Sequence, residues 1–312
     1  MSPQKSFRTP RPGGAEAGFL MALASMSAVQ LGSALTVPLF GQLTAAGAAG
    51  LRLGWAGLLL LILVRPRRRD FARADLLACA VLGVATAGMM LFFMLAIARL
   101  PMGTASALEF LGPLAVSLYG PGADRKTWAA AAAVGVTLLT EPWRGSLDLI
   151  GVGYALAAAT CWAAYILLTQ RVGDRVTGLK GLAVSMPVAG LLTMLVATPT
   201  LATRLTWPAA ATMLGLAVLS PLVPFALEFL ALRRLTSSAF GTLMSLEPAI
   251  ALLIGLVVLG QTPGLLSALG IAFVVAAGVG ATRTGGRPDT EHAAPAPQRV
   301  PDPSASPAAS GH

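Results

Sequence analysis

The sequence predicts an all-α membrane protein with ten transmembrane helices, arranged as two inverted five-helix repeats with both termini in the cytoplasm. Composition, the spacing of apolar stretches and a match between the two halves all point to this fold. Of the 312 residues, 55% are hydrophobic and 11% are charged, whereas soluble domains carry roughly 25% charge. A mean hydropathy of +0.75 leaves too much apolar surface for a soluble core, so lipid must cover most of it.

Ten apolar stretches are long enough to cross a bilayer as helix, which takes about 17 to 25 residues. The first is too long for the core of a cleaved signal peptide, so we interpret it as a span. The predicted spans are near 17–39, 45–64, 76–98, 102–120, 126–141, 149–169, 179–198, 209–232, 238–259 and 264–282.

These spans divide the chain into five parts. The composition after residue 282, rich in Pro, Ala and Ser, is typical of disorder. The parts are a cytoplasmic tail (1–16), a first five-helix repeat (17–141), a linker (142–151), a second five-helix repeat (152–282) and a disordered cytoplasmic tail (283–312).

The basic residues set the expected orientation. Eighteen of the 22 Lys and Arg fall on one side of the predicted spans, and only Arg99, Arg144 and Arg204 fall on the other, with Arg52 inside a span. Because cytoplasmic loops are enriched in Lys and Arg, both termini are expected in the cytoplasm. The formal charge of +9 is explained by the same rule and by an anionic membrane surface, so no nucleic-acid partner is expected.

The two halves of the chain match at a constant offset of 135 residues. This offset places Arg99 over Arg234 and Leu100 over Leu235. Five spans per unit is an odd number, so the second unit must enter the membrane from the opposite side. Inverted repeats are typical of transporters, whose two halves expose a central site to one side and then the other.

Four ionisable residues lie deep in the predicted spans: Arg52, Glu109, Glu228 and Glu247. A charge at the middle of a bilayer costs about 2.5 to 3.5 kcal/mol on insertion scales, so such groups usually face a polar cavity or one another. We interpret Arg52, Glu109 and Glu247 as a substrate- and proton-binding site. The alternative is an Arg–Glu pair that only locks helices together. For Glu228, pairing with arginines at the cytoplasmic surface is an equal alternative.

Two prolines predict breaks in the helices beside the carboxylates. Pro113 and Pro248 occupy matching places in the two halves, and each removes one backbone hydrogen bond. For Pro113 the freed carbonyl is that of Glu109. Broken helices at bilayer depth are often the binding sites of transporters.

Gln30, Trp162 and Tyr165 are further candidates for the substrate site. The offset places Gln30 over Tyr165, in the first span of each half. These side chains could line a common vestibule, and the alternative for each is packing or hydrogen bonding between helices. The Gly50-x-x-x-Gly54 pair predicts close helix packing instead.

The sequence gives no indication of an enzyme. Both histidines, His292 and His312, lie in the C-terminal tail, and the spans hold no metal-ligand cluster. A Walker loop, a dinucleotide glycine motif and a nucleophile elbow are all missing from the sequence. No metal or other cofactor is therefore expected, and an ion gradient must supply the energy for transport.

Five motifs follow one another between about residues 20 and 282: MSAVQLGSAL, ALEFLGPLAVSL, CWAAYILLTQR, LEFLALRRL and FGTLMSLEPAIA. In order and spacing they resemble EamA-type members of the drug/metabolite transporter superfamily, and among them the threonine/homoserine exporters of bacterial inner membranes. The FGTLMSLEP segment is the most specific. The resemblance implies export of small hydrophilic amino acids by proton antiport, with matching residues at Gln30, Arg52, Glu109, Tyr165, Glu228 and Glu247.

We therefore expect a secondary active exporter in the bacterial inner membrane, whose partners are an amino acid, protons and lipid. Glu109 and Glu247 would exchange protons for the cargo's ammonium, and Arg52 would hold its carboxylate. A drug exporter is the alternative within transport, although five Trp and three Tyr are few for it. A passive channel would carry a flux insensitive to a proton uncoupler. The sequence leaves a monomer and a homodimer open.

Overall fold

The structure is a computed structural model, and the segments it describes are mainly α-helical, with no β-strand among them. Much of both predicted tails and of the linker lies outside those segments, together with Arg144, Arg233 and Arg234. The described residues are 14–67, 69, 71–119, 125–141, 148–173, 175–176, 179–232 and 243–284.

The first half begins with α1 (Gly14–Thr36), which continues through the 3-10 turn η1 (Val37–Leu39) into α2 (Phe40–Val64). The backbone of α2 leaves helical geometry at Thr44, directly before the predicted start of the second span at residue 45. The half continues with α3 (Arg73–Ile97), α4 (Met102–Glu109), α5 (Leu111–Tyr119) and α6 (Arg125–Thr140).

The second half contains a helix that is interrupted in its middle. It consists of α9 (Trp207–Ala217), the π-helical turn η4 (Val218–Leu222) and α10 (Val223–Leu232). The other helices of this half are α7 (Leu149–Gly173), α8 (Lys180–Arg204), α12 (Glu247–Leu259) and α13 (Leu265–Thr284).

Each predicted span thus contains a helix or a pair of helices. Four described stretches are long and apolar enough by themselves to cross a membrane: Glu16–Val64, Arg73–Ile97, Leu149–Thr169 and Lys180–Pro199. These stretches confirm an all-helical membrane protein, and ten separate crossings stay a prediction.

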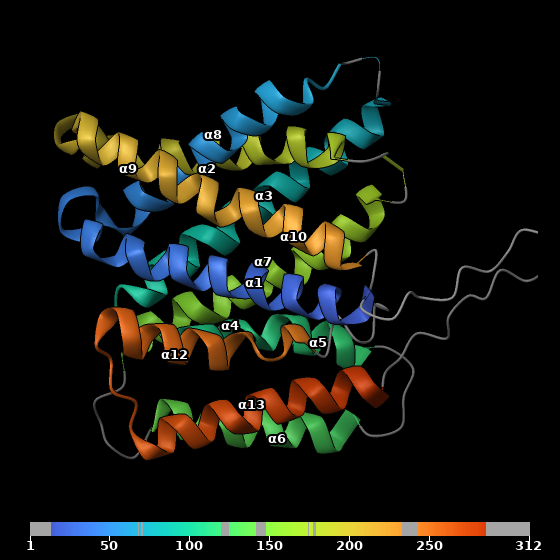
Figure 1. The fold of residues 1–312 in the computed structure, drawn as a ribbon, viewed down its shortest axis with the longest axis vertical. Coiled ribbons are helices and arrows are strands. Elements are labelled where there is room, and N and C mark those ends of the chain that lie inside the picture. Colours follow the sequence, from blue (N-terminus) through green and yellow to red (C-terminus); the bar gives the residue numbers. More distant parts are fainter. Residues whose placement is uncertain are drawn as a thin grey trace, which may run out of the picture.

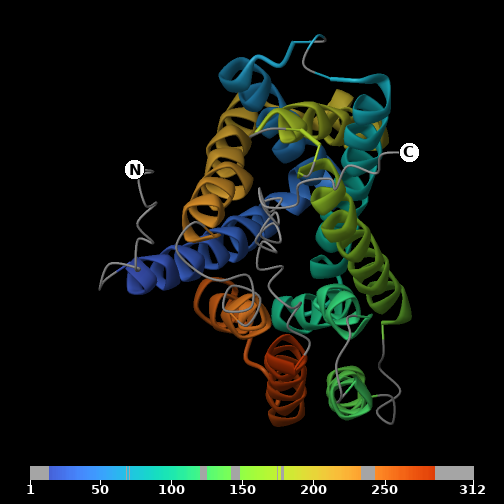
Figure 2. The ribbon, with the colours of Figure 1, turned by 90° about the vertical axis from the view of Figure 1, so that its right-hand side faces the viewer.

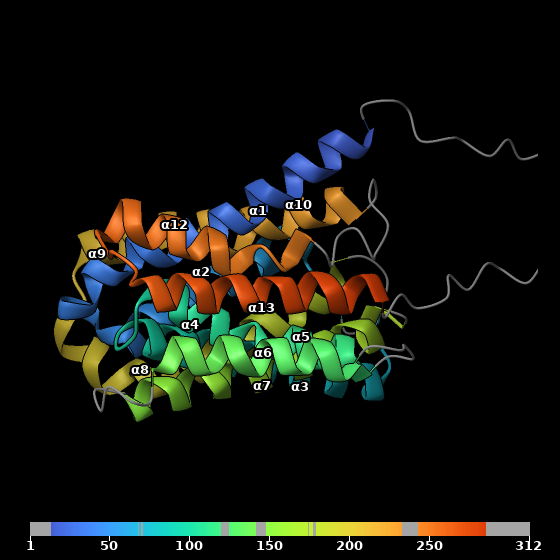
Figure 3. The ribbon, with the colours of Figure 1, turned by 90° about the horizontal axis from the view of Figure 1, so that it is seen from below.

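The helices lie side by side in a bundle (Figure 1). At one end of the long axis are α2, α8 and α9, and at the other end α6 and α13 pack as a pair, which Figure 2 shows from the side. The first turn of α1 and the last turn of α13 lie at the same end of the helices (Figures 1 and 3). That placement agrees with termini on one side of a membrane; which side it is stays a prediction.

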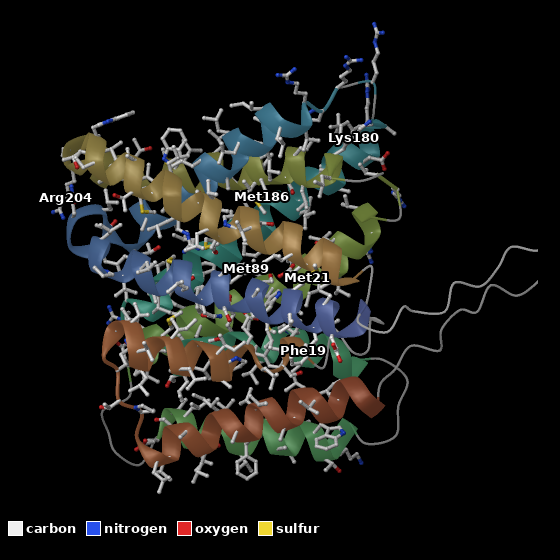
Figure 4. All side chains as sticks on the ribbon, in the orientation of Figure 1. Phe19, Met21, Met89, Lys180, Met186 and Arg204 are labelled. Atoms are coloured by element: carbon white, nitrogen blue, oxygen red, sulfur yellow. The ribbon has the colours of Figure 1, made fainter. Side chains whose placement is uncertain are left out.

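The outer surface of the bundle is strongly apolar. Large side chains such as Leu63 and Val257 expose 72% and 81% of their surface. Phe19 of α1 is 41% exposed, and Figure 4 shows Lys180 and Arg204 at opposite ends of α8. Contiguous apolar surface bounded by charged helix ends is what a lipid-facing bundle presents.

Glycines allow two pairs of helices to pack closely. A Cβ atom on Gly50 would lie 3.2 Å from the Cβ atom of Ala197 in α8, and Gly54 also faces α8, which confirms the predicted packing role of this pair. On α6 and α13, a Cβ on Gly135 or on Gly270 would lie 2.8 Å from the carbonyl oxygen of the other glycine. Small residues at such contacts let helix backbones approach in a membrane.

Candidate functional site

A break separates α4 from α5 at the predicted place. Helix α4 ends at Glu109, Phe110 forms a turn, and α5 begins at Leu111 with Pro113 in its first turn. The Phe110 N–H donates to the Ser106 carbonyl at 2.9 Å, so the chain continues in the same direction after the break. Glu109 is therefore the last residue of a half-helix, as the position of Pro113 predicts.

The second predicted break differs in detail. Pro248 does not interrupt a helix; it lies in the first turn of α12, and Glu247 is the first residue of that helix. Proline is well tolerated there because the first N–H groups of a helix have no partner within the helix. The break precedes Glu247, so the two carboxylates lie at opposite kinds of helix end.

Glu247 and Gln30 form a buried pair between α12 and α1. The Gln30 Nε2 group donates to Glu247 Oε1 at 2.9 Å. Gln30 exposes 1% of its surface and Glu247 6%. The second oxygen of Glu247 and the side-chain oxygen of Gln30 are buried without a hydrogen-bond partner. Buried polar atoms normally have hydrogen-bond partners, so these two oxygens are exceptions to the usual pattern.

Glu109 lies near this pair. It exposes 6% of its surface, and its carboxyl group interacts electrostatically with that of Glu247. A similar interaction links Glu247 with Glu228. The structure thus brings the two predicted exchange residues together, with the third carboxylate within electrostatic reach.

Arg52 binds the interrupted helix of the second half. Its Nη2 group donates to Ser220 Oγ at 2.7 Å and to the Ser220 carbonyl oxygen at 3.2 Å, and its Nε group reaches the same carbonyl at 3.3 Å. Its Nη1 group lies 3.5 Å from Ser33 Oγ and 3.8 Å from the Met94 sulfur. The non-helical backbone of Ser220 in η4 presents the carbonyl to the guanidinium group.

The guanidinium of Arg52 is completely buried among neutral groups. Among the described residues, no carboxylate lies within 4 Å of it, so an Arg52–Glu pair that only locks helices together is not formed. A buried cation without an anion is costly. The hydrogen-bond acceptors that Arg52 contacts are all uncharged, and its predicted binding of substrate stays a prediction.

Glu228 is held by a hydrogen bond between α10 and α1. Its Oε1 atom accepts a hydrogen bond from the Ser25 hydroxyl at 3.0 Å, and that hydroxyl also lies 3.2 Å from the Pro224 carbonyl oxygen. Ser25 belongs to α1 and Glu228 to α10. The alternative partners of Glu228, Arg233 and Arg234, lie outside the described residues.

The two aromatic candidates occupy apolar surroundings. Trp162 packs edge-on against Phe110, with 6.2 Å between ring centroids, beside the α4–α5 break. Tyr165 packs against the apolar cluster around Cys79 and interacts electrostatically with Glu228. No described contact joins either ring to Gln30, and the common vestibule of Gln30, Trp162 and Tyr165 stays a prediction.

Sequence reasoning did not identify the serines of the site. Ser25, Ser33 and Ser220 bind the charged groups, and Ser106 precedes Glu109 by one helical turn. Spacing could have indicated two of them, because Ser33 follows Gln30 by three residues and Ser106 precedes Glu109 by three, which places each pair on one helix face. Ser220 has no such signal, since its partner Arg52 is 168 residues away.

An ion pair joins the two halves away from these groups. Arg99, after α3, binds Asp148, directly before α7, at 2.9 Å. The backbone N–H of Gly151 donates to the Asp148 carboxylate at 2.9 Å. This N–H and the Arg99 side chain lower the pKa of Asp148 below its ordinary value.

Comparison with known proteins agrees with this arrangement. The EamA-like transporter family model matches residues 149–282. The threonine/homoserine exporter RhtA of Salmonella typhimurium (strain LT2) is 36% identical over 272 residues, covering 85% of this chain and 91% of the exporter. The threonine/homoserine exporter RhtA of Escherichia coli (strain K12) is 37% identical over 267 residues, covering 84% and 90%.

A solved crystal structure shares the fold. Its TM-score is 0.56 at 19% identity, over 88% of this chain and 99% of that chain. The relatives and the apolar helices confirm the predicted place in the bacterial inner membrane and a transporter rather than an enzyme. The chain belongs to the EamA-like transporter family.

Proposed function

We propose that this protein exports small hydroxyl-bearing amino acids, of the threonine and homoserine class, in exchange for protons. The relatives that match 84–85% of its length are named threonine/homoserine exporters. Because one transporter fold serves many substrates, the site itself must support the choice of cargo.

The observation that carries this proposal is the spacing of opposite charges along one face of α1. Gln30 binds the anionic group, Glu247. Three residues later, Ser33 binds the cationic group, Arg52. Residues at this spacing are neighbours on a helix, about 5 Å apart. An α-amino acid carries its ammonium and carboxylate on one carbon atom, so it suits the interval between the two charges.

Arg52 supplies the carboxylate-binding end of the site. A guanidinium group presents several N–H donors in a plane and binds carboxylates through two parallel hydrogen bonds. Its present acceptors are neutral, so the cargo carboxylate provides the missing negative charge. Ser33 and Ser220 keep the guanidinium in position between cargo molecules.

Glu247 supplies the ammonium-binding end and the coupling to protons. Its unpartnered oxygen accepts either a proton or the ammonium of the cargo. When both Glu247 and Glu109 are ionised they repel each other, and either a proton or an ammonium relieves this repulsion. Because the two ligands compete for the same carboxylates, inward movement of protons drives outward movement of cargo.

Two inverted repeats provide the alternating access. If a two-fold axis relates the halves, each helix contact must recur with its partners exchanged. Helix α3 packs on α7 as α10 packs on α1, and α3 packs on α8 as α9 packs on α2. The α2–α8 and α6–α13 contacts each join two helices that the offset matches with one another, so these contacts are unchanged by the exchange. Gly135 and Gly270, equivalent by the offset, also meet each other, which supports the repeat arrangement.

Counterflow in proteoliposomes tests the proposal. We expect the purified protein to exchange labelled threonine and homoserine, and a pH gradient to drive their accumulation. In Glu247→Gln we expect proton-driven accumulation to fall at least about tenfold, because the amide cannot bind a proton and loses a charge-assisted hydrogen bond to the ammonium. The matched control is Glu16→Gln at the exposed start of α1, which should behave as the wild type.

Two results would contradict the proposal. Equal export by Glu247→Gln and the wild type, at equal expression, would remove Glu247 from the exchange site. Threonine flux that ignores both the pH gradient and a proton uncoupler would indicate a passive facilitator.

A further inference from the structure

Ser106 has a buried hydroxyl group without a partner. It lies in α4, exposes 1% of its surface, and its Oγ atom makes no hydrogen bond. One turn later on the same helix face is Glu109. A buried hydroxyl left unpaired is destabilising, so its presence beside the carboxylates requires an explanation.

Other hydroxyls in the helices show that Ser106 could satisfy itself locally. The hydroxyls of Thr86 and Thr193 donate to carbonyl groups one turn earlier, each at 2.8 Å, which is the ordinary solution in a helix. Ser25 and Ser33 bind groups on other helices. Among the buried serines of the described segments, Ser106 alone is without a hydrogen-bond partner.

The packing of α4 on α12 places Ser106 at the level of the exchange site. Met102, at the start of α4, lies 3.4 Å from where a Cβ on Gly255 would be, near the end of α12. At the opposite ends, Phe110 and Ser245 both contact Gly278. The two helices are therefore antiparallel, so the middle of α4 faces the first half of α12, where Glu247 lies.

Arg52, which has no anionic partner among the described residues, and the polar groups without hydrogen bonds lie on neighbouring helices. Arg52 of α2 bonds Ser33 of α1, and Gln30 of α1 bonds Glu247 of α12. Ser106 is on α4, which lies at about the same height as α12 in Figure 1. Contacts of α1 with α12 and of α12 with α4 join the series. The order of groups is cation, anion, hydroxyl, which is complementary to a carboxylate, an ammonium and a side-chain hydroxyl.

We infer that Ser106 recognises the side-chain hydroxyl of the transported amino acid and so selects hydroxy amino acids over aliphatic ones of similar size. The inference rests on the proposed function. The Ser106 hydroxyl both donates and accepts, and the Glu109 carboxylate one turn away accepts the remaining hydrogen. An aliphatic cargo leaves Ser106 unpaired in a buried site, whereas a hydroxy amino acid satisfies it.

Competition by 2-aminobutyrate tests this inference, because this amino acid is threonine or homoserine without the hydroxyl group. In counterflow of labelled threonine, we expect unlabelled threonine to compete about tenfold better than 2-aminobutyrate with the wild type. In Ser106→Ala the preference should fall to about one, with competition by 2-aminobutyrate retained. The control Ser185→Ala removes another buried serine hydroxyl, which bonds the Leu182 carbonyl, and should keep the wild-type preference.

The outcomes separate this inference from the proposed function. If the wild type exchanges threonine and Ser106→Ala keeps the preference, only the role of Ser106 is wrong. Equal competition by threonine and 2-aminobutyrate in the wild type overturns the inferred role of Ser106 without the need for a variant. Absence of amino-acid exchange by the wild type overturns the proposed function and the role of Ser106 together.

Discussion

The third helix of the first half and its counterpart in the second half differ in continuity. Helix α3 runs without interruption from Arg73 to Ile97. The 135-residue offset places it over residues 208–232, where η4 interrupts the helix and Ser220 leaves helical geometry. Both elements pack in equivalent places, α3 on α7 and α10 on α1.

This difference shows how two segments that match in sequence can provide different backbone hydrogen-bonding groups. The carbonyls within a continuous helix are already bonded, whereas an interruption frees them. The freed Ser220 carbonyl binds Arg52, and the equivalent residue in α3 is Ala85. The equivalent of Arg52 itself is Pro187 in α8.

The carboxylate of Glu247 likewise has no counterpart in the first half. The offset places Glu247 over Gly112, where a Cβ atom would overlap the carbonyl of Ala159 in α7. A glutamate cannot fit there without moving α7. Packing against α7 in the first half therefore excludes a glutamate at the position that the offset matches with Glu247.

The largest effect is expected at the contact between Arg52 of the first half and the interrupted helix of the second half. Arg52→Lys keeps the charge, but one ammonium group cannot hold Ser220 and Ser33 while binding a carboxylate. We expect threonine counterflow to fall at least about tenfold, with normal insertion in the membrane. Arg204→Lys, at the exposed end of α8 (Figure 4), is the control, and activity of Arg52→Lys within about twofold of wild type would show that the guanidinium is not required.

A medium effect is expected where α1 approaches the interruption. A Cβ atom on Gly32 would lie 2.7 Å from the Cβ of Ser220 and 3.6 Å from Nη2 of Arg52. Gly32→Ala should lower stability by about 1 to 3 kcal/mol through overpacking, measured by thermal unfolding in detergent. Gly215→Ala in α9, with no atom within 4 Å of its Cβ, should not lower it. Equal unfolding temperatures of the two variants would mean that α1 does not pack tightly on η4.

The smallest effect is expected at the ion pair outside the site. Because the folded protein lowers the pKa of Asp148, the ionised form contributes stability above the ordinary value of 3.8, and this contribution is lost as the pH falls through the lower folded-state value. Asp148→Asn should therefore unfold at a slightly lower temperature than the wild type near pH 7, and the difference should disappear in strong acid. Since exposed pairs contribute little, a large loss at pH 7 would make this pair a principal tie between the halves.

The sequence predicted which charged residues are buried in the bundle and where a helix is broken. Burial of Arg52, Glu109 and Glu247 is confirmed, as is the break beside Pro113. These predictions succeed because the cost of a charge or a proline in a membrane helix depends on the residue and its depth alone. For Pro248 the same reasoning located the break but placed it inside a helix, whereas α12 begins there.

By itself, then, the sequence determined a membrane bundle of apolar helices and the few polar residues within it, because a bilayer imposes these features on each segment separately. Only the tertiary structure decided which residues meet. Gln30 and Glu247 are 217 residues apart, and Arg52 binds an uncharged serine rather than a carboxylate. Such partners depend on how helices rotate and pack against one another, and the packing role of a small residue such as Gly32 is visible only when its neighbours are in place.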